Sequence, residues 1–540
     1  MPSSLSLQLL RLRRPVVGLF FGLLGLVGLL LYGDYGLPWD EQLDRLNGII
    51  SLKYAALKLA PALARREPSF ADIPDMRDNQ DTDHGVIFQL PLLLLERAVG
   101  AEDARQVYLL RHLATFFTFL GGVYCFFRLA THRFRRWLLG LLGAALLVLT
   151  PRLFAEAFYN YKDLVFLAFF VTSVYTLLRL LRRPTWRAVL WHAAATGAAI
   201  DVRTMGVLLL GLTLGFAGLE MAYRPTLRRR FMNLLPLYLG STALVVVLGW
   251  PYLWENPVGH FLEAFQSFSR YRSDMTVQYW GRQLSVRQLP WHYAPVWLLI
   301  TTPPVYCLLF GVGTATVLGA AWRRPRAWLR TRSGRQDLLF AAWFFGPLLA
   351  VVVLQSVMYD GWRHLYFIYP AFLLLALRGV QVAWRGWRTA GPGGWRQRLG
   401  GGLLLLLAVG TAHTAGRMVR EHPYQNLYFS GLSGQQAERL FERDYWGLAG
   451  RQGLEWILAH DVRPQVRVGT DARTGLVLHN NSLLLPPAAR NRLVLTSADQ
   501  AQYFLTVYRW HPQPYPASYG REVHCIRVEG IKILSVFQRP

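Results

Sequence analysis

The chain has few charged residues and very few cysteines, and each shortage excludes a class of protein. Only 17% of its 540 residues are charged, whereas 53% are hydrophobic. This composition is typical of polytopic membrane proteins and argues against a soluble enzyme. The three cysteines, Cys125, Cys307 and Cys525, are far apart, and the first two lie in apolar runs. Neither a disulfide framework nor a thiolate metal site is therefore indicated.

Acidic residues are also scarce, since 32 of them stand against 58 lysines and arginines, which gives a net charge of +26. Such a charge could indicate nucleic-acid binding. The basic residues, however, occur in short clusters between apolar runs, where they set the orientation of a chain in the membrane. We therefore expect membrane lipids as partners, and no nucleic acid.

Apolar runs long enough to cross about 30 Å of hydrocarbon predict an α-helical polytopic membrane protein with about eleven transmembrane helices. The spans are expected near residues 15–33, 107–130, 137–157, 163–181, 188–202, 205–222, 233–253, 293–321, 337–358, 364–383 and 400–416. Residues 188–222 are too long for one helix, so we divide them at Asp201–Thr204. Nothing after the first run resembles a small-residue cleavage site, so we expect a retained signal-anchor.

Basic loops predict the orientation. Eleven spans put the N-terminus and residues 131–136, 182–187, 223–232, 322–336 and 384–399 on one side, and these segments carry arginine clusters without any Asp or Glu. By the positive-inside rule this side is cytoplasmic. Nearly all carboxylates then lie on the extracytoplasmic side, where we expect the functional site.

Two domains are predicted. Residues 1–416 form the transmembrane domain, whose first outer loop, 34–106, contains an amphipathic stretch at 52–63 that we expect to lie along the membrane as an interfacial helix. Residues 417–540 form a small extracytoplasmic α/β domain, with strands expected at 465–469, 503–508 and 531–537 and a helix near 448–460.

Polar side chains gather at the outer ends of the predicted spans. Ionisable groups at membrane depth are costly and usually face a cavity, so this gathering indicates a polar site. The candidates are Asp40 and Glu41 after the first span, Asp83 and His84 in the first outer loop, Lys162 and Asp163 after the third span, Arg203 after the fifth, and Arg363 and Tyr366 before the tenth.

The order and spacing of these segments resemble the GT-C class of integral-membrane glycosyltransferases. Within this class the sequence resembles the glycosyltransferase family 39-like branch, which contains protein O-mannosyltransferases, lipid A aminoarabinose transferases and their bacterial relatives. The resemblance covers roughly the first 430 residues. Asp40-Glu41 is similar to the Asp-Glu pair of that branch, residues 151–163 to its proline-to-Asp turn, and Trp362–Tyr366 with Pro370 to its Arg-Tyr-Pro segment. Asp83-His84-Gly85 and Val202-Arg203-Thr204 depart from the family pattern, so its substrate details are not transferred.

The resemblance implies sugar transfer, with inversion, from a polyprenyl-phosphate donor such as an undecaprenyl-phosphate sugar to a hydroxyl of a glycan, lipid or protein acceptor. It further implies a bacterial inner (plasma) membrane enzyme. A carboxylate at the membrane edge can deprotonate the acceptor, and Asp40 is our first choice, with Glu41 second. Arg203, helped by Lys162 and Arg363, would bind the donor phosphate.

The other candidates have supporting roles. Asp163, Asp83, His84 and Tyr366 would orient substrate. We expect no obligatory cofactor and no metal, since no Asp/His spacing indicates a ligand set.

Alternative interpretations exist at each position. Asp40 could simply cap the following helix, Arg203 could meet a lipid headgroup, and Lys162 and Arg363 could extend to the interface. Trp39 fits an aromatic interfacial belt as well as a sugar-stacking platform. The alternative functions are a polytopic transporter or lipid flippase, and a structural membrane protein. Transporters, however, place polar groups near the bilayer midplane and often show two related halves, and neither feature is found in this sequence.

Overall fold

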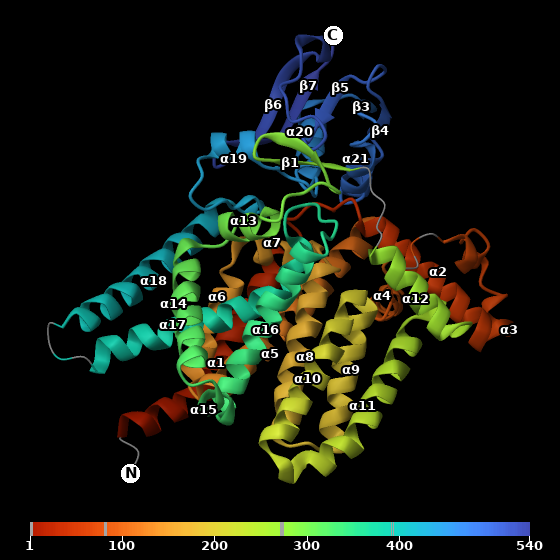
Figure 1. Ribbon diagram of the computed structural model, residues 1–540. Coiled ribbons are helices and arrows are strands. Elements are labelled where there is room, and N and C mark those ends of the chain that lie inside the picture. The colour runs from red at the N-terminus through yellow and green to blue at the C-terminus, as the bar shows by residue number, and fades with distance from the viewer. Residues whose placement is uncertain (1–3, 80, 82–83, 270–274, 390, 392–393) are drawn as a thin grey trace.

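The chain folds into a bundle of long helices with a smaller sheet domain at one end (Figure 1). The computed structural model describes residues 4–79, 81, 84–269, 275–389, 391 and 394–540. In these residues nine helices are long and apolar enough to cross a membrane, or ten if the bent pair α6 (Trp137–Val148) and α7 (Pro151–Tyr159) is one span. The predicted fold class, a helical multi-pass membrane protein with a small C-terminal α/β domain, is confirmed.

In three of these nine spans a short 3-10 turn precedes the α-helix and extends it. Their bounds are α1 (Ser4–Leu31), α5 (Ala104–Phe134), α8 (Asp163–Arg182), η3 (Thr204–Val207) with α10 (Leu208–Tyr223), η4 (Pro225–Leu227) and α11 (Arg228–Gly249), α14 (Pro304–Arg323), α16 (Arg332–Val353), η6 (Arg363–Ile368) with α17 (Tyr369–Thr389), and α18 (Trp395–Arg420).

The predicted count of eleven differs from the structure at residues 188–202. They lie in α9 (Trp186–Val202), which packs against α8 and α11 but has only 17 residues. Its 17 residues are at the lower limit of the roughly 17 to 25 residues of a membrane-spanning helix, so it is not among the nine longer helices. It nevertheless runs along α8, because Arg203 at its end contacts Asp163 at the start of α8. The predicted span 293–321 is also divided, into α13 (Tyr293–Ile300) and α14, because Pro303 and Pro304 begin a new helix.

The bend between α6 and α7 brings polar groups into the protein interior. The two helices differ in direction by 71°. Pro151 has no N–H group, so it begins α7 instead of continuing α6. All nine residues of α7 are buried, and they include Arg152 and Glu156. The segment that the sequence predicted as part of an outer turn is therefore a buried helix.

The first outer loop is largely helical. It contains α2 (Glu41–Leu59), α3 (Pro61–Ala64), η1 (Pro68–Phe70), η2 (Met76–Asp78) and α4 (Gln89–Ala98). The helix predicted over 52–63 is the second half of α2 together with α3, with a break before Pro61. α2 buries Asp44, Asn47 and Ser51 and exposes Leu43 and Leu46. An interfacial helix would present its leucines to lipid in this way.

The loop after α11 carries further short elements. These are η5 (Pro251–Trp254), α12 (Pro257–Ser269) and the antiparallel strands β1 (Thr276–Tyr279) and β2 (Arg282–Ser285). A different connection, between α14 and α16, contains the short helix α15 (Pro325–Arg330). Tyr279 at the end of β1 forms a β-bridge with Phe441, so the loop is joined to the C-terminal region.

The C-terminal domain is built around a five-stranded mixed sheet. The strands are β3 (Val466–Thr470), β4 (Leu493–Ser497), β5 (Tyr503–Thr506), β6 (Arg521–Val528) and β7 (Ile531–Gln538), in the order β4-β3-β5-β7-β6. β3 is parallel to β4 and β5, whereas β7 is antiparallel to β5 and β6. The helices and turns are η7 (Gln425–Leu427), α19 (Gly434–Leu440), α20 (Gly450–His460), α21 (Gly475–Ser482), α22 (Pro487–Arg490) and η8 (Ala517–Tyr519).

The three predicted strands and the predicted helix of this domain are confirmed as β3, β5, β7 and α20. The sequence missed β4 and β6, because most of their residues are only partly buried and they lack a clear alternation of apolar and polar side chains. The domain boundary near residue 417 stays a prediction.

Candidate functional site

Asp40 lies at the start of α2 without acting as its cap. It occupies the N-cap position, but its side chain accepts no capping hydrogen bond. Its carboxylate instead lies 3.6 Å from the guanidinium of Arg363, and 25% of the side chain is exposed. Burial raises the pKa of the Asp40 carboxyl, although the charges of Arg363 and Lys162 act against the rise. The side chain is therefore accessible and is not committed to local structure.

Glu41 points into a different environment from its neighbour. Arg111 of α5 donates to Glu41 Oε1 at 2.6 Å and to Glu96 Oε1 at 2.9 Å, and it also donates to Gln89. All four side chains are buried. Burial raises the pKa of Glu41 to about 7, against the effect of Arg111. This cluster fastens the first outer loop to α5, which favours Asp40 over Glu41 as the reacting carboxylate.

Asp44 lies one turn after Asp40, so both carboxylates share one face of α2. Its Oδ1 atom lies 2.7 Å from Lys162 Nζ and 3.2 Å from His84 Nε2. Burial would raise the pKa of Asp44, but the charges of Lys162 and His84 bring it below its ordinary value. Asp44 was not among the residues predicted from the sequence, although its spacing of four from Asp40 was an available signal.

Asp163 joins two of the predicted cations. Arg203 Nη2 lies 2.5 Å from its Oδ1 atom, and Arg363 Nη1 lies 3.4 Å from its Oδ2 atom. Asn160 orients the same carboxylate, because its Oδ1 atom accepts from the Asp163 backbone N–H and its amide donates to Oδ2. Asp163 is buried, whereas the side chain of Arg203 is 11% exposed and that of Lys162 is 22% exposed.

Arg363 is the centre of the network. It is buried and pairs with Asp40, Asp163 and Asp360, the last at 3.1 Å. The turn before it requires left-handed backbone, with φ of +57° at Asp360 and +71° at Gly361. Glycine adopts such a conformation without strain. The turn directs Asp360 and Arg363 toward each other, so Arg363 holds three carboxylates in place and has little surface left for a ligand.

A second group of polar contacts surrounds Glu156 of α7. Tyr366, a predicted substrate-orienting residue, donates to Glu156 Oε1 at 2.7 Å. Tyr445, from the C-terminal region, donates to the same oxygen at 2.9 Å. Both hydroxyls are buried beside Arg152. Tyr366 therefore helps to fix α7, and the accessible groups lie nearer to Asp40.

The C-terminal domain contributes directly to the site. Arg509 donates to Asp360 Oδ1 at 2.6 Å, and its guanidinium lies 4.3 Å from the Trp39 ring and 4.6 Å from the Trp510 ring. Trp39 thus packs inside the protein against the C-terminal domain. Sequence analysis missed Arg509 because no motif connects it to the membrane domain.

Two asparagines of α21 hold the segment that precedes Asp40. Asn481 accepts from the Leu37 backbone N–H at 3.1 Å and donates to the Leu37 carbonyl, while Asn480 donates to the Pro38 carbonyl at 2.9 Å. These contacts join positions more than 440 residues apart. The position of Asp40 therefore depends on the C-terminal domain.

The structure brings together most of the predicted site residues. Their ion pairs form two neighbouring sets: Arg363 and Asp163 join Asp40 and Arg203, and Asp44 joins Lys162 and His84. The charge of Lys162 also acts on Asp40. Glu41 and Tyr366 lie in adjoining buried clusters. Asp83 lies outside the described residues. The roles assigned to all of them stay predictions.

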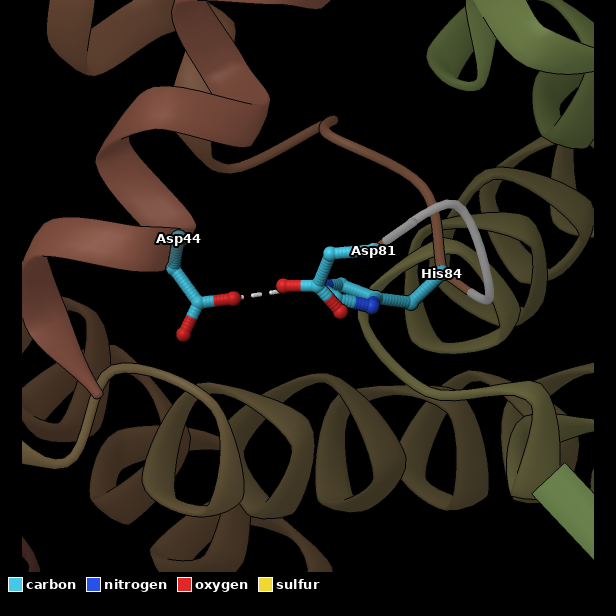
Figure 2. Close-up of side chains that lie close together, drawn as sticks. All are labelled: Asp44, Asp81 and His84. Atoms are coloured by element: carbon cyan, nitrogen blue, oxygen red, sulfur yellow. Dashed lines mark hydrogen bonds and ion pairs between the residues drawn. The ribbon is translucent and has the colours of Figure 1, made fainter. Parts of the chain in front are cut away.

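One cluster in this region has side chains suited to a metal ion. Figure 2 shows the carboxylate of Asp44 facing Asp81 and His84, and the ligand atoms of these three residues lie within 4.8 Å of one another. The Lys162 ammonium already contacts Asp44. The expectation that no metal is required stays a prediction.

Comparisons with known proteins give similar structures. Neither a protein-family model nor a curated protein sequence matches the chain. The crystal structure of ArnT from Cupriavidus metallidurans in the apo state has a TM-score of 0.49 at 13% identity, over 97% of this chain and 98% of that one. The same protein bound to undecaprenyl phosphate has a TM-score of 0.46 at 13% identity, with the same coverage.

A third similar structure belongs to a longer protein. The Archaeoglobus fulgidus oligosaccharyltransferase in the apo form has a TM-score of 0.48 at 10% identity over 78% of this chain, which spans 57% of its length. Because all three TM-scores lie below 0.5, the function is inferred from the residues of the site itself.

Proposed function

We propose that the chain is a membrane glycosyltransferase that moves a sugar from a polyprenyl-phosphate donor to an acceptor hydroxyl, with Asp40 as the general base. One observation carries the proposal: Asp40 is the accessible carboxylate beside three buried ones. Its side chain is 25% exposed, whereas those of Asp44, Asp163 and Asp360 are at most 2% exposed. A base must be accessible to its substrate, and Asp40 is the carboxylate of this group that meets the requirement.

The chemistry follows from these positions. Asp40 takes the proton of the acceptor hydroxyl while the hydroxyl oxygen attacks the anomeric carbon of the donor sugar. The bond to the lipid phosphate breaks, and its electron pair leaves with the phosphate oxygen. Lys162 and Arg203, the partly exposed cations, bind the phosphate and stabilise this charge. Among the described carboxylates paired with Arg363, Asp40 alone is accessible, which supports one displacement with inversion, since retention by double displacement needs a second carboxylate as nucleophile.

Arg363 has a different role in this proposal from the one that the sequence predicted. Because it is buried among three carboxylates, it positions Asp40 and Asp163 rather than binding the donor. The family resemblance leads us to place the enzyme in the bacterial plasma membrane, and the arginine-rich loops predict that the site lies on the extracytoplasmic side.

The test is a transfer assay on the purified chain in nanodiscs. A panel of radiolabelled undecaprenyl-phosphate hexoses and pentoses is offered, and released undecaprenyl phosphate is measured. We expect turnover of at least one donor. Asp40→Asn should bind that donor but not consume it, and Arg203→Gln should raise the donor KM. Arg467→Gln, an exposed arginine of β3, is the matched control and should behave as wild type.

Two results would contradict the proposal. Turnover by Asp40→Asn at the wild-type rate would remove Asp40 as base. Failure to turn over any donor, together with movement of a solute across liposomes, would favour a transporter instead.

A further inference from the structure

The span ends opposite the proposed catalytic site carry a second group of charged side chains. α8 begins at Asp163 of the site and ends at Arg182, and its 20 residues correspond to about 30 Å at 1.5 Å per residue. α15, which immediately precedes α16, lies at the lower side of Figure 1, opposite the sheet domain. The arginine-rich loops predict that this side of the membrane is cytoplasmic.

Exposed arginines from three helix ends converge on this side. They are Arg135 at the turn between α5 and α6, Arg182 at the end of α8 and Arg332 at the start of α16. The charges of all three act on His132, and Arg182 Nη1 lies 3.5 Å from His132 Nε2. The charges of Arg182 and Arg332 also act on each other. The fold therefore holds like charges from distant parts of the sequence close together.

The acidic residues around this group are already paired. Glu220, near the end of α10, accepts from Arg335 at 2.7 Å and lies 3.3 Å from Arg224. Asp337 lies 2.5 Å from the buried Arg133. In the described part of the chain none of the three exposed arginines forms an ion pair with a carboxylate, although the charge of Glu220 reaches the start of α16. An anion bound between these arginines would offset their mutual repulsion.

Aromatic residues place the three arginines at the depth of the lipid headgroups. Trp137 and Trp186 are the first residues of α6 and α9, and Tyr223 is the last residue of α10. Such rings are enriched at the interface between membrane and water. One turn further along α9, Leu190 is 40% exposed and Trp191 is 71% exposed, as expected of side chains that contact acyl chains. An anion at this depth is the phosphate of a lipid headgroup.

We propose that Arg135, Arg182 and Arg332 bind the phosphate headgroup of an anionic phospholipid in this leaflet. Arginine suits this task because its guanidinium stays charged and its planar donors match phosphate oxygens. A zwitterionic headgroup carries a cation beside its phosphate, which the arginines repel. The lipid joins α5, α8 and α16 at their ends opposite the proposed catalytic site. It is distinct from the donor lipid, whose phosphate the proposed function places at Lys162 and Arg203.

The test measures lipid binding by the full chain without donor or acceptor. Dioctanoyl phosphatidylglycerol, dioctanoyl phosphatidylcholine and inorganic phosphate are each titrated into the protein in detergent, and binding is followed by microscale thermophoresis. We expect phosphatidylglycerol to bind more tightly than phosphatidylcholine or inorganic phosphate. One arginine near an anionic headgroup contributes about fivefold in affinity, so Arg182→Gln/Arg332→Gln should weaken phosphatidylglycerol binding about 25-fold.

A matched control removes the same charge outside the proposed lipid site. Arg229→Gln/Arg230→Gln changes two exposed arginines of α11 on the same side of the membrane. It should weaken binding less than about threefold, because salt screens charges that do not contact the headgroup. Arg182→Lys keeps the charge and loses the planar donors, so its affinity should lie between those of wild type and Arg182→Gln.

Three results would overturn the inference. They are equal affinity for phosphatidylglycerol and phosphatidylcholine, an equal loss in the two double variants, and wild-type affinity in Arg182→Gln/Arg332→Gln. Inorganic phosphate that binds as tightly as phosphatidylglycerol would identify a site for a soluble anion and contradict a lipid site. None of these measurements involves turnover, so the inference and the proposed function are tested independently.

Discussion

Two neighbouring carboxylates, Asp40 and Glu41, should respond differently to the same substitution: turnover should fall strongly in the Asp40 variant and change little in the Glu41 variant. Each is replaced by its amide, Asp40→Asn and Glu41→Gln, which removes a charge and keeps the shape. If Asp40 is the base, its variant loses the part of the rate that proton transfer supplies, about 100- to 10,000-fold. This loss corresponds to about 3 to 5 kcal/mol in the activation free energy.

The structure predicts a small change for Glu41→Gln. Its pKa of about 7 means that the buried carboxyl is partly protonated at neutral pH, and an amide can still accept from Arg111. Turnover should stay within about threefold of wild type, a difference below 1 kcal/mol. Asp40→Asn should change stability little, because in the described part of the chain Asp40 makes one long ion contact, at the edge of the network.

The assay compares kcat for the best donor with the thermal unfolding midpoint of each variant in detergent. Loss of turnover in Asp40→Asn with an unchanged midpoint supports the reasoning. The reverse pattern, an active Asp40→Asn and an inactive Glu41→Gln, would refute it and make Glu41 the base.

Four further predictions follow from the same contacts. Arg363→Met leaves buried carboxylates without its guanidinium, so it should lower the free energy of unfolding by about 3 to 5 kcal/mol; an unchanged denaturation midpoint would contradict this. A Cβ on Gly249 would lie 2.1 Å from the Asp201 carboxylate, whereas one on Gly240, in the same helix, meets nothing within 4 Å. Gly249→Ala should therefore destabilise by about 1 to 3 kcal/mol and Gly240→Ala should not, as thermal unfolding can check. Because burial raises the pKa of Asp40 and a base must be ionised, kcat/KM should fall with decreasing pH at a midpoint above the ordinary value of about 3.9; a midpoint below it would count against Asp40. EDTA should leave turnover unchanged, since a lysine ammonium already contacts the buried carboxylate of Figure 2; loss of activity restored by a divalent ion would show a metal requirement.

Hydrophobicity predicted the membrane helices well because the bilayer imposes a length and a composition on each of them. It failed where local geometry decides. Pro151 bends and Pro303 breaks segments that hydrophobicity predicted as single spans.

Residues of the candidate site could be predicted where a charged residue adjoins a long apolar run in the sequence, as at Asp163, Arg203 and Arg363. It was not predictable where polar residues of the C-terminal domain meet the membrane domain. Arg509 is one of many arginines in the sequence, and only the fold brings it to Asp360.

The hydrogen bonds from α21 to the segment before Asp40 have a consequence for biosynthesis. Leu37 and Asn481 are 444 positions apart, and a ribosome that adds roughly 5 to 20 residues per second needs on the order of 20 to 90 s between them. Throughout that interval the N-terminal segment is already made while its anchor is not. A nascent or truncated chain that stops before α21 would insert its spans yet leave Asp40 unfixed. If the chain is the transferase that we propose, such a truncated copy should be inactive even when its spans are inserted.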